Sequence, residues 1–246
     1  MNTAERLSKV AEGLEKTQEL NTELESIING GDTGYKSHYH KFWDKHQKNG
    51  TRGNYSYAFG ADSADDNGWD DELFKPKYDI IATGASYMFR YSKITNLKQI
   101  LIDCGVKFIP NTTMFYYTFH ASTITHIPDL SSTEVKNCQN AFNGCANLVS
   151  IDKLKVIETC VFDAAFIGCT SLENLIIEGV IGTGSFNVRY SPKLSKASIT
   201  SIINALSTTT SGLTVTLSKT AKEAAFTTDE WNTLIATKSN WTISLV

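Results

Sequence analysis

The sequence predicts an α/β repeat protein, a leucine-rich-repeat-like solenoid of about five stacked coils between an N-terminal helix and an α/β C-terminal cap. Three observations lead to this fold class. A short motif recurs in the middle of the chain, an amphipathic segment precedes it, and helix and strand patterns follow it. We therefore expect an N-terminal helix over 1–31, a cap region over 32–84, the repeats over 85–195 and a closing cap over 196–246.

The repeat is clearest where the segment NAFNGCANLVSI is followed, 24 residues later, by AAFIGCTSLENL. Leu148 and Leu172 lie at the same offset behind the aromatic residue of each segment. The aromatic anchors of successive units are 30, 23, 24 and 20 residues apart; they are Phe89, Phe119, Phe142, Phe166 and, in a weaker unit, Phe186. A period in this range is typical of leucine-rich repeats. Because one unit cannot bury its own apolar face, we expect the units to stack and share a core.

The chain after residue 195 has a different pattern. Apolar residues first recur at helical spacing and later alternate with polar residues, as in a half-buried strand. The pattern predicts helices over 197–207, 219–226 and 229–238, and strands over 213–218 and 241–246. We expect the two strands to extend the repeat sheet and to close its last open edge.

The composition is that of a globular protein with a substantial core. The chain has 246 residues, of which 41% are hydrophobic and 20% charged, and its net charge is −3. This charge argues against a general nucleic-acid or membrane-surface binder. No apolar run is long enough to span a membrane, and the first residues, MNTAERLSKVAEGLEK, lack the apolar core of a secretory signal. We therefore expect synthesis in a bacterial cytoplasm, where the protein either stays or is released by a route that needs no signal, such as lysis.

Residues 3–29 are expected to form one helix that begins at Thr3 and ends before Gly30. Seven residues of this segment fall at the a and d positions of a heptad repeat, and two of them are polar, so the apolar stripe is weak. The helix could assemble the chain into a homo-oligomer or dock on a partner. It could equally pack on its own domain, and the sequence leaves both alternatives open.

Two further segments precede the repeats. Residues 35–59 interleave basic and aromatic side chains, which can bind single-stranded nucleic acid or sugars by stacking, but we favour a cap whose aromatic residues lie in its core. Residues 62–72 hold six acidic side chains. Such a segment could be a calcium-binding EF-hand loop, but an alignment excludes this, because Ser63 and Phe74 occupy loop positions that require acidic residues. The nearby histidines complete no metal site; they are His38, His40 and His46.

Cysteines occur at equivalent positions of the two clearest units, as Cys145 and Cys169. They should be neighbours on adjacent coils, at a separation that a disulfide can span. We favour two free thiols that fill a tight corner of each coil, although a disulfide remains an alternative. The other cysteines share no equivalent position and no CxxC pair, so we expect no zinc site; they are Cys104, Cys138 and Cys160.

Common catalytic motifs are absent, since the chain has no Walker A sequence, no HExxH and no GxSxG. We therefore nominate no catalytic, cofactor-binding or metal-binding residue, and we expect a protein that is not an enzyme and needs no cofactor. The candidate binding surface consists of side chains that suit contact with a protein or a glycan; they are Tyr91, Tyr116, Tyr117, His120 and Tyr190. The alternative for each of them is that it fills the core.

The repeat units resemble those of BspA-like leucine-rich repeat proteins, which carry an AF or MF pair followed by Cys, Leu and Ile. The resemblance covers residues 85–195, and the matching residues are Met88, Phe89, Ala141, Phe142, Cys145, Leu148, Ile151, Ala165, Phe166, Cys169, Leu172 and Leu175. Many members of this family are surface or secreted adhesins of bacteria. The whole chain is similar to gene products of phages and prophages of Gram-positive gut bacteria.

The resemblance implies a non-enzymatic structural or interaction protein, associated with a phage virion or tail as a receptor-binding or decoration component. Its partner would be a protein or a cell-surface glycan, without nucleic acid or membrane. One alternative is a bacterial surface adhesin, which should carry an export signal or a cell-wall anchor. A second alternative is a glycan-active enzyme, which should hold two acids within about 10 Å in a concave groove.

Overall fold

A computed structural model describes part of the chain: residues 52–54, 56, 58–61, 69–70, 81–95, 107–108, 115–130 and 133–246. These residues belong to a compact unit that extends from Asn49 to Val246. The helix expected over 3–29, its proposed role in oligomerisation and the three histidines lie outside the described residues. So do Cys104 and most of the segments 35–59 and 62–72.

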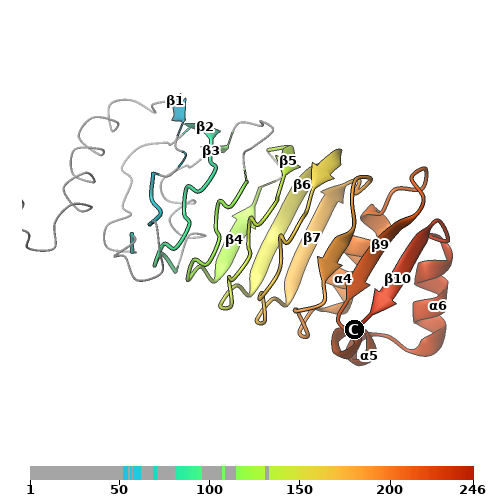
Figure 1. The fold of residues 1–246 in the computed structure, drawn as a ribbon. Coiled ribbons are helices and arrows are strands. Elements are labelled where there is room, and N and C mark those ends of the chain that lie inside the picture. Colours follow the sequence, from blue (N-terminus) through green and yellow to red (C-terminus); the bar gives the residue numbers. More distant parts are fainter. Residues whose placement is uncertain are drawn as a thin grey trace, which may run out of the picture. The chain divides into compact units, whose positions relative to one another are not determined.

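The described part of this unit consists mostly of short strands, and its helices lie between the last strands along the chain (Figure 1). The strands are β1 (Arg52–Asn54), β2 (Ile81–Gly84), β3 (Lys107–Phe108), β4 (His126–Asp129), β5 (Val135–Asn137), β6 (Ser150–Val161), β7 (Asn174–Gly179), β8 (Phe186–Val188), β9 (Leu213–Leu217) and β10 (Trp241–Leu245). The helices are α4 (Lys196–Ala205), α5 (Lys219–Ala225) and α6 (Thr228–Ala236). All five elements predicted after residue 195 are present, and their boundaries differ from the prediction by at most two residues.

Side-chain caps fix where two of the helices begin. At α4, the Ser195 hydroxyl accepts a hydrogen bond from the Ser198 N–H at 3.2 Å. At α6, Thr227 and Glu230 form a capping box, in which each side chain accepts from the other residue's backbone N–H. Such caps satisfy N–H groups that the first helical turn leaves without partners. None of the described helices combines the length and apolar character that crossing a membrane requires.

The described strands form three separate sheets, and every strand pair is parallel. The first sheet contains β1, β2 and β3, the second joins β4, β5 and β7 to β6, and the third contains β8, β9 and β10. In the second sheet, Ile127 pairs with Ile151, and Ile151 pairs with Leu175. These residues are fully buried, as are Leu148 and Leu172. The aliphatic core therefore continues from each strand to the next.

The prediction of a leucine-rich-repeat-like solenoid is wrong, because the described strands divide into three short sheets and α4 follows β7 and β8 in place of a further repeat strand. The outer edge of β7 meets this helix. Leu175 N–H donates to Ser198 Oγ at 2.9 Å. Ile177 N–H donates to Ser201 Oγ, also at 2.9 Å. The two serine hydroxyls donate in turn to the carbonyls of Glu173 and Ile177.

The helix thus satisfies the strand edge that a further repeat would have used, which is one way to end a sheet. The expectation that the last two strands extend the repeat sheet is wrong for the same reason. Strands β9 and β10 instead join β8, where Leu213 pairs with Trp241 and Val215 pairs with Phe186. Figure 1 shows this third sheet beyond β7, with α4, α5 and α6 beside it.

A row of phenylalanine rings passes through the stacked turns of the chain; the six are Phe59, Phe89, Phe119, Phe142, Phe166 and Phe186. Neighbouring ring centroids lie 5.4 to 5.5 Å apart, and no ring is more than 1% exposed. Phe59 was not a predicted anchor, because it lies in the segment assigned to the cap. Its spacing of 30 residues to Phe89 equals the next spacing along the chain.

Backbone hydrogen bonds hold these turns in register. Phe89 N–H donates to the Thr118 carbonyl at 2.7 Å, and Phe119 N–H donates to the Ala141 carbonyl at 2.8 Å. These two anchors, like Phe142, thus bond to the residue that precedes the anchor of the next turn. The regular bond explains why the rings lie at nearly constant separation.

The four described cysteines are buried free thiols. Cys145 Sγ donates to the Phe119 carbonyl at 2.8 Å, and Cys169 Sγ donates to the Phe142 carbonyl at 3.1 Å. Each thiol therefore ties its own turn to the preceding one. Burial raises the pKa of Cys145 to about 11, so this group remains a neutral thiol at neutral pH.

Cys138 and Cys160 share no equivalent offset from their anchors, as expected, but the sequence interpretation missed that their sulfur atoms lie 3.9 Å apart. Cys138 N–H also donates to the Val161 carbonyl at 2.7 Å. The register between β5 and β6 shifts after Val135. Extra residues of β6 are accommodated there, so cysteines at unequal offsets from their anchors become neighbours.

Candidate functional site

Four side chains of each stacked turn lie outside the core, at fixed offsets from the anchor phenylalanine. They are three and two residues before the anchor, and one and two residues after it; none of them is buried. We call this set the turn face, and it consists of Ser86, Tyr87, Arg90 and Tyr91 in the Phe89 turn, Tyr116, Tyr117, His120 and Ala121 in the Phe119 turn, Gln139, Asn140, Asn143 and Gly144 in the Phe142 turn, and Asp163, Ala164, Ile167 and Gly168 in the Phe166 turn. Its composition changes from aromatic to amide to small along the stack.

Three tyrosines of the turn face pack against one another. The rings of Tyr87 and Tyr117 are stacked, with centroids 5.1 Å apart and an interplanar angle of 12°. Tyr116 packs edge-on against both, with centroid distances of 5.4 Å to Tyr87 and 4.8 Å to Tyr117. Since all three are half-buried, the group forms a fixed aromatic platform that still reaches solvent.

Arg90 and His120 extend this platform. The guanidinium carbon of Arg90 lies 4.7 Å from the ring centroid of Tyr91 and 5.5 Å from that of Tyr87. The His120 ring lies 5.3 Å from Tyr91 and 5.2 Å from Tyr117, centroid to centroid. Buried Arg90 Nε and His120 Nδ1 have no hydrogen-bond partner in the described part of the chain. Polar atoms of this kind are uncommon in native structures.

The structure brings four of the five candidate surface residues into this one cluster. The fifth, Tyr190, instead contacts Arg189, whose Nη2 donates to its hydroxyl at 2.6 Å. The sequence interpretation missed Tyr87 and Arg90. Aligning the turns on their anchors would have found both, because Tyr87 and Tyr117 share one offset, and Arg90 and His120 share another.

Three tyrosines of the cluster have left-handed backbone conformations. Their φ angles are 58° at Tyr87, 55° at Tyr91 and 53° at Tyr117. A bulky residue at positive φ is an outlier, since its Cβ crowds the backbone. The side chains of these three tyrosines are thus held on a strained backbone.

Comparisons with protein-family models, with curated proteins and with solved structures find no match to this chain.

We expect His120 to make folding stability fall as the pH drops below 6.5, the ordinary pKa of histidine. Burial, and secondarily the charge of Arg90, lowers the pKa of His120 in the folded chain. The unfolded chain then binds this proton more readily, so protons favour unfolding below that pH, and the contribution is constant above it. Urea unfolding between about pH 5 and 8 measures the effect. In the His120→Gln variant, whose amide does not titrate, the free energy of unfolding should change less between these pH values. An equal change in both proteins would contradict the prediction.

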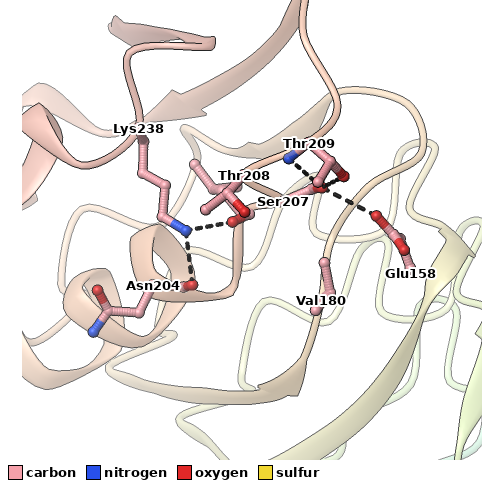
Figure 2. A pocket seen from close by; sticks show the side chains of 8 residues that line it. Glu158, Val180, Asn204, Ser207, Thr208, Thr209 and Lys238 are labelled. Carbon is pink, nitrogen blue, oxygen red and sulfur yellow. Dashed lines mark hydrogen bonds between the residues drawn. The ribbon is translucent and has the colours of Figure 1, made fainter.

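A pocket of about 320 Å³ lies at the C-terminal end of α4. Figure 2 shows Lys238 and Glu158 at opposite sides of it, with Ser207 between them. Lys238 Nζ donates to the Asn204 carbonyl at 3.1 Å and to the Leu206 carbonyl. Both carbonyls belong to the end of the helix, where backbone acceptors lack intrahelical partners. Burial lowers the pKa of Lys238, and the lysine acts here as a C-terminal cap.

The polar groups of this pocket satisfy one another. Ser207 Oγ donates to Glu158 Oε1 at 3.0 Å and accepts from the Thr209 N–H at 3.2 Å. Glu158 is the one carboxylate among the lining residues, so the pocket does not supply the two acids of a glycoside hydrolase. Within the described ranges, no three His, Cys, Asp or Glu side chains are placed to hold a metal ion. The turn face is therefore the stronger candidate for a binding site.

Proposed function

We propose that the chain is a non-enzymatic interaction protein whose turn face binds a ligand. The observation that carries this proposal is the left-handed backbone of Tyr87, Tyr91 and Tyr117. Such conformations are costly and persist where the surrounding structure imposes them, often at binding sites. Rigid tyrosines also offer large contact area at a low entropic cost.

The chain itself supplies the comparison that supports this interpretation. In the Phe142 turn, the positions of Tyr87 and Tyr91 are occupied by Asn140 and Gly144, with φ of 52° and 77°. Asn and Gly adopt this conformation with little strain. The same backbone is therefore made elsewhere in the stack without aromatic side chains. Because folding of the turn does not require tyrosine, we assign these tyrosines to ligand contact.

The strain has a measurable consequence at Tyr91. We expect Tyr91→Gly to be more stable than Tyr91→Ala by about 1 kcal/mol, because only glycine relaxes at a φ of 55°. Both variants lose the same ring contacts, so the comparison isolates the backbone. Urea unfolding of the two variants gives the difference in free energy of unfolding.

The matched control is the exposed Asn232, inside helix α6. Here the order should reverse, with Asn232→Gly less stable than Asn232→Ala by about 1 kcal/mol. The same order at both positions would mean that Tyr91 is not strained. The proposal would then lose the observation on which it depends.

Binding itself is tested with a three-site variant that copies the Phe142 turn, namely Tyr87→Asn, Tyr91→Gly and Tyr117→Asn. The full chain and this variant are applied to an array of immobilised glycans, glycoproteins and deglycosylated proteins. We expect the full chain to bind one class of probe and the variant, still folded, to lose that binding. Equal binding by both proteins, or no binding by either, would refute the proposed function.

We further propose, from the resemblance to phage-encoded proteins, that the chain is carried on a virion or phage tail as a binding or decoration component. Mass spectrometry of purified particles released by lysis should then detect its peptides at a fixed ratio to the major structural protein. Peptides found only in the unassembled fraction of the lysate would argue against this location. The turn face could serve a surface adhesin equally well, so the particle measurement separates the two alternatives.

A further inference from the structure

We infer, on the basis of the proposed function, that the ligand of the turn face is a neutral glycan chain of pyranose sugars. The stacked tyrosines of the Phe89 and Phe119 turns would contact the apolar face of one sugar. The amides of the Phe142 turn would bind the hydroxyl groups of the next sugar along the chain.

The aromatic part of the site is already arranged for stacking. The rings of Tyr87 and Tyr117 are stacked and nearly parallel, at 12°, and Tyr116 packs edge-on against them at 85° and 73°. These contacts fix the rings before a ligand arrives, which reduces the entropic cost of binding. The electron-rich face of an aromatic ring attracts the positive edges of C–H groups. One face of a pyranose ring presents such C–H groups.

The amide part of the site repeats the geometry of the aromatic part. In the turns of Phe89, Phe119 and Phe142, the side chain two residues before the anchor contacts the side chain one residue after it. Tyr117 contacts His120 in this way at 5.2 Å. In the next turn, Asn143 Nδ2 donates to Asn140 Oδ1 at 2.7 Å. This bond orients both amides, and it leaves the Asn140 NH₂ group and the Asn143 oxygen for sugar hydroxyls.

The repeat distance of the stack suits a polymer of sugars. Anchor rings of adjacent turns lie 5.4 to 5.5 Å apart, a distance comparable to the length of one pyranose residue in an extended chain. Successive sugars would therefore meet successive turns in similar positions. A single sugar would reach only one of the two kinds of contact.

Small residues keep one strip of the turn face low. The positions that follow each anchor by two residues are Tyr91, Ala121, Gly144 and Gly168. A Cβ atom added to Gly144 would lie 3.3 Å from Ala121 Cα, so a side chain at Gly144 would crowd the neighbouring turn. Tyr91 carries the large side chain at one end of this row, and Gly144 lies in the same turn as the two amides. A flat sugar chain fits such a strip better than a folded protein surface does.

Charge and hydrophobicity argue against other classes of ligand. The formally charged side chains of the turn face are Arg90 and Asp163, which have opposite signs. A nucleic acid would require several lysines or arginines to pair with phosphates. Large contiguous apolar patches mark many protein-interaction sites. Among the described large hydrophobic residues that are exposed, Ile167 alone belongs to this face.

The test uses the full chain and an array of neutral glycans, anionic glycans and single-stranded oligothymidylate, followed by calorimetric titration of the glycan that binds. We expect a neutral glycan to bind, and its affinity to rise from disaccharide to tetrasaccharide. Tyr117→Asn should weaken binding by about tenfold or more, and Asn143→Ala by about threefold or more. Tyr190→Ala is the matched control, because this exposed tyrosine lies outside the turn face, and it should bind as the unchanged protein does.

The outcomes separate the ligand class from the proposed function. If no neutral glycan binds, but a deglycosylated protein or oligothymidylate binds and the three-site variant loses it, the glycan inference is wrong and the binding function stands. If Tyr190→Ala and Tyr117→Asn weaken glycan binding equally, the turn face is not the glycan site. If the three-site variant loses no binding at all, both proposals fall.

Discussion

Replacement of Phe142 by alanine is expected to lower the free energy of unfolding by about 3 to 5 kcal/mol. Its ring is fully buried and lies between two others, 5.5 Å from Phe119 and 5.4 Å from Phe166. Removing it leaves a cavity that backbone bonds between the turns prevent from closing. Phe142 N–H donates to the Ala165 carbonyl at 3.0 Å, and Cys169 Sγ donates to the Phe142 carbonyl.

Ile167→Ala is the matched control for this prediction. Ile167 directly follows Phe166 on a stacked turn, but its side chain is 38% exposed. Its replacement should change the free energy of unfolding by only about 0.5 kcal/mol. Urea unfolding followed by tryptophan fluorescence measures both values. Similar losses in the two variants would show that the row of rings is not the main source of cohesion between turns.

The row of rings could be predicted from the sequence because it depends on local spacing. Each anchor from Phe89 to Phe166 is followed five or six residues later by Leu or Ile, with another Leu or Ile three residues further on. Burying such residues requires the units to stack. The arrangement of the strands could not be predicted in this way. Whether β7 meets another strand or a helix depends on Ser198 and Ser201, whose hydroxyls accept hydrogen bonds from its edge. Serine in a helix carries no sequence signal for such a contact.

The candidate site was predicted in part for a similar reason. Exposed aromatic residues near the anchors identify Tyr91, Tyr116 and Tyr117, and the regular turns bring them together. The left-handed backbone could not be predicted, because tyrosine strongly disfavours that conformation and nothing local signals it. The glycines at the offset of Tyr91 in later turns, Gly144 and Gly168, indicate that this position requires positive φ. The contact between Cys138 and Cys160 was missed because a register shift precedes it.

Gly179→Ala is expected to have the second large effect on stability, a loss of about 3 kcal/mol or more. Gly179 has a φ of 107°, and a Cβ atom added to it would lie 2.0 Å from the carbonyl oxygen of Val156. Val156 is its pairing partner at the end of β7. Since the obstacle is backbone, no side chain can turn aside to make room. The strand end must separate from β6 or the variant must unfold.

Gly212→Ala distinguishes this clash from the cost of the backbone conformation alone. Gly212 also has a positive φ, of 78°, but an added Cβ would meet no atom within 4 Å. Its replacement should therefore cost only about 1 kcal/mol. Urea unfolding of both variants gives their losses in free energy of unfolding. The larger loss at Gly179 would come from the close approach of β6 and β7. Equal losses would mean that the end of β7 separates from β6 easily, and that the sheet is held mainly by the buried pairs nearer its start, such as Ile151 and Leu175.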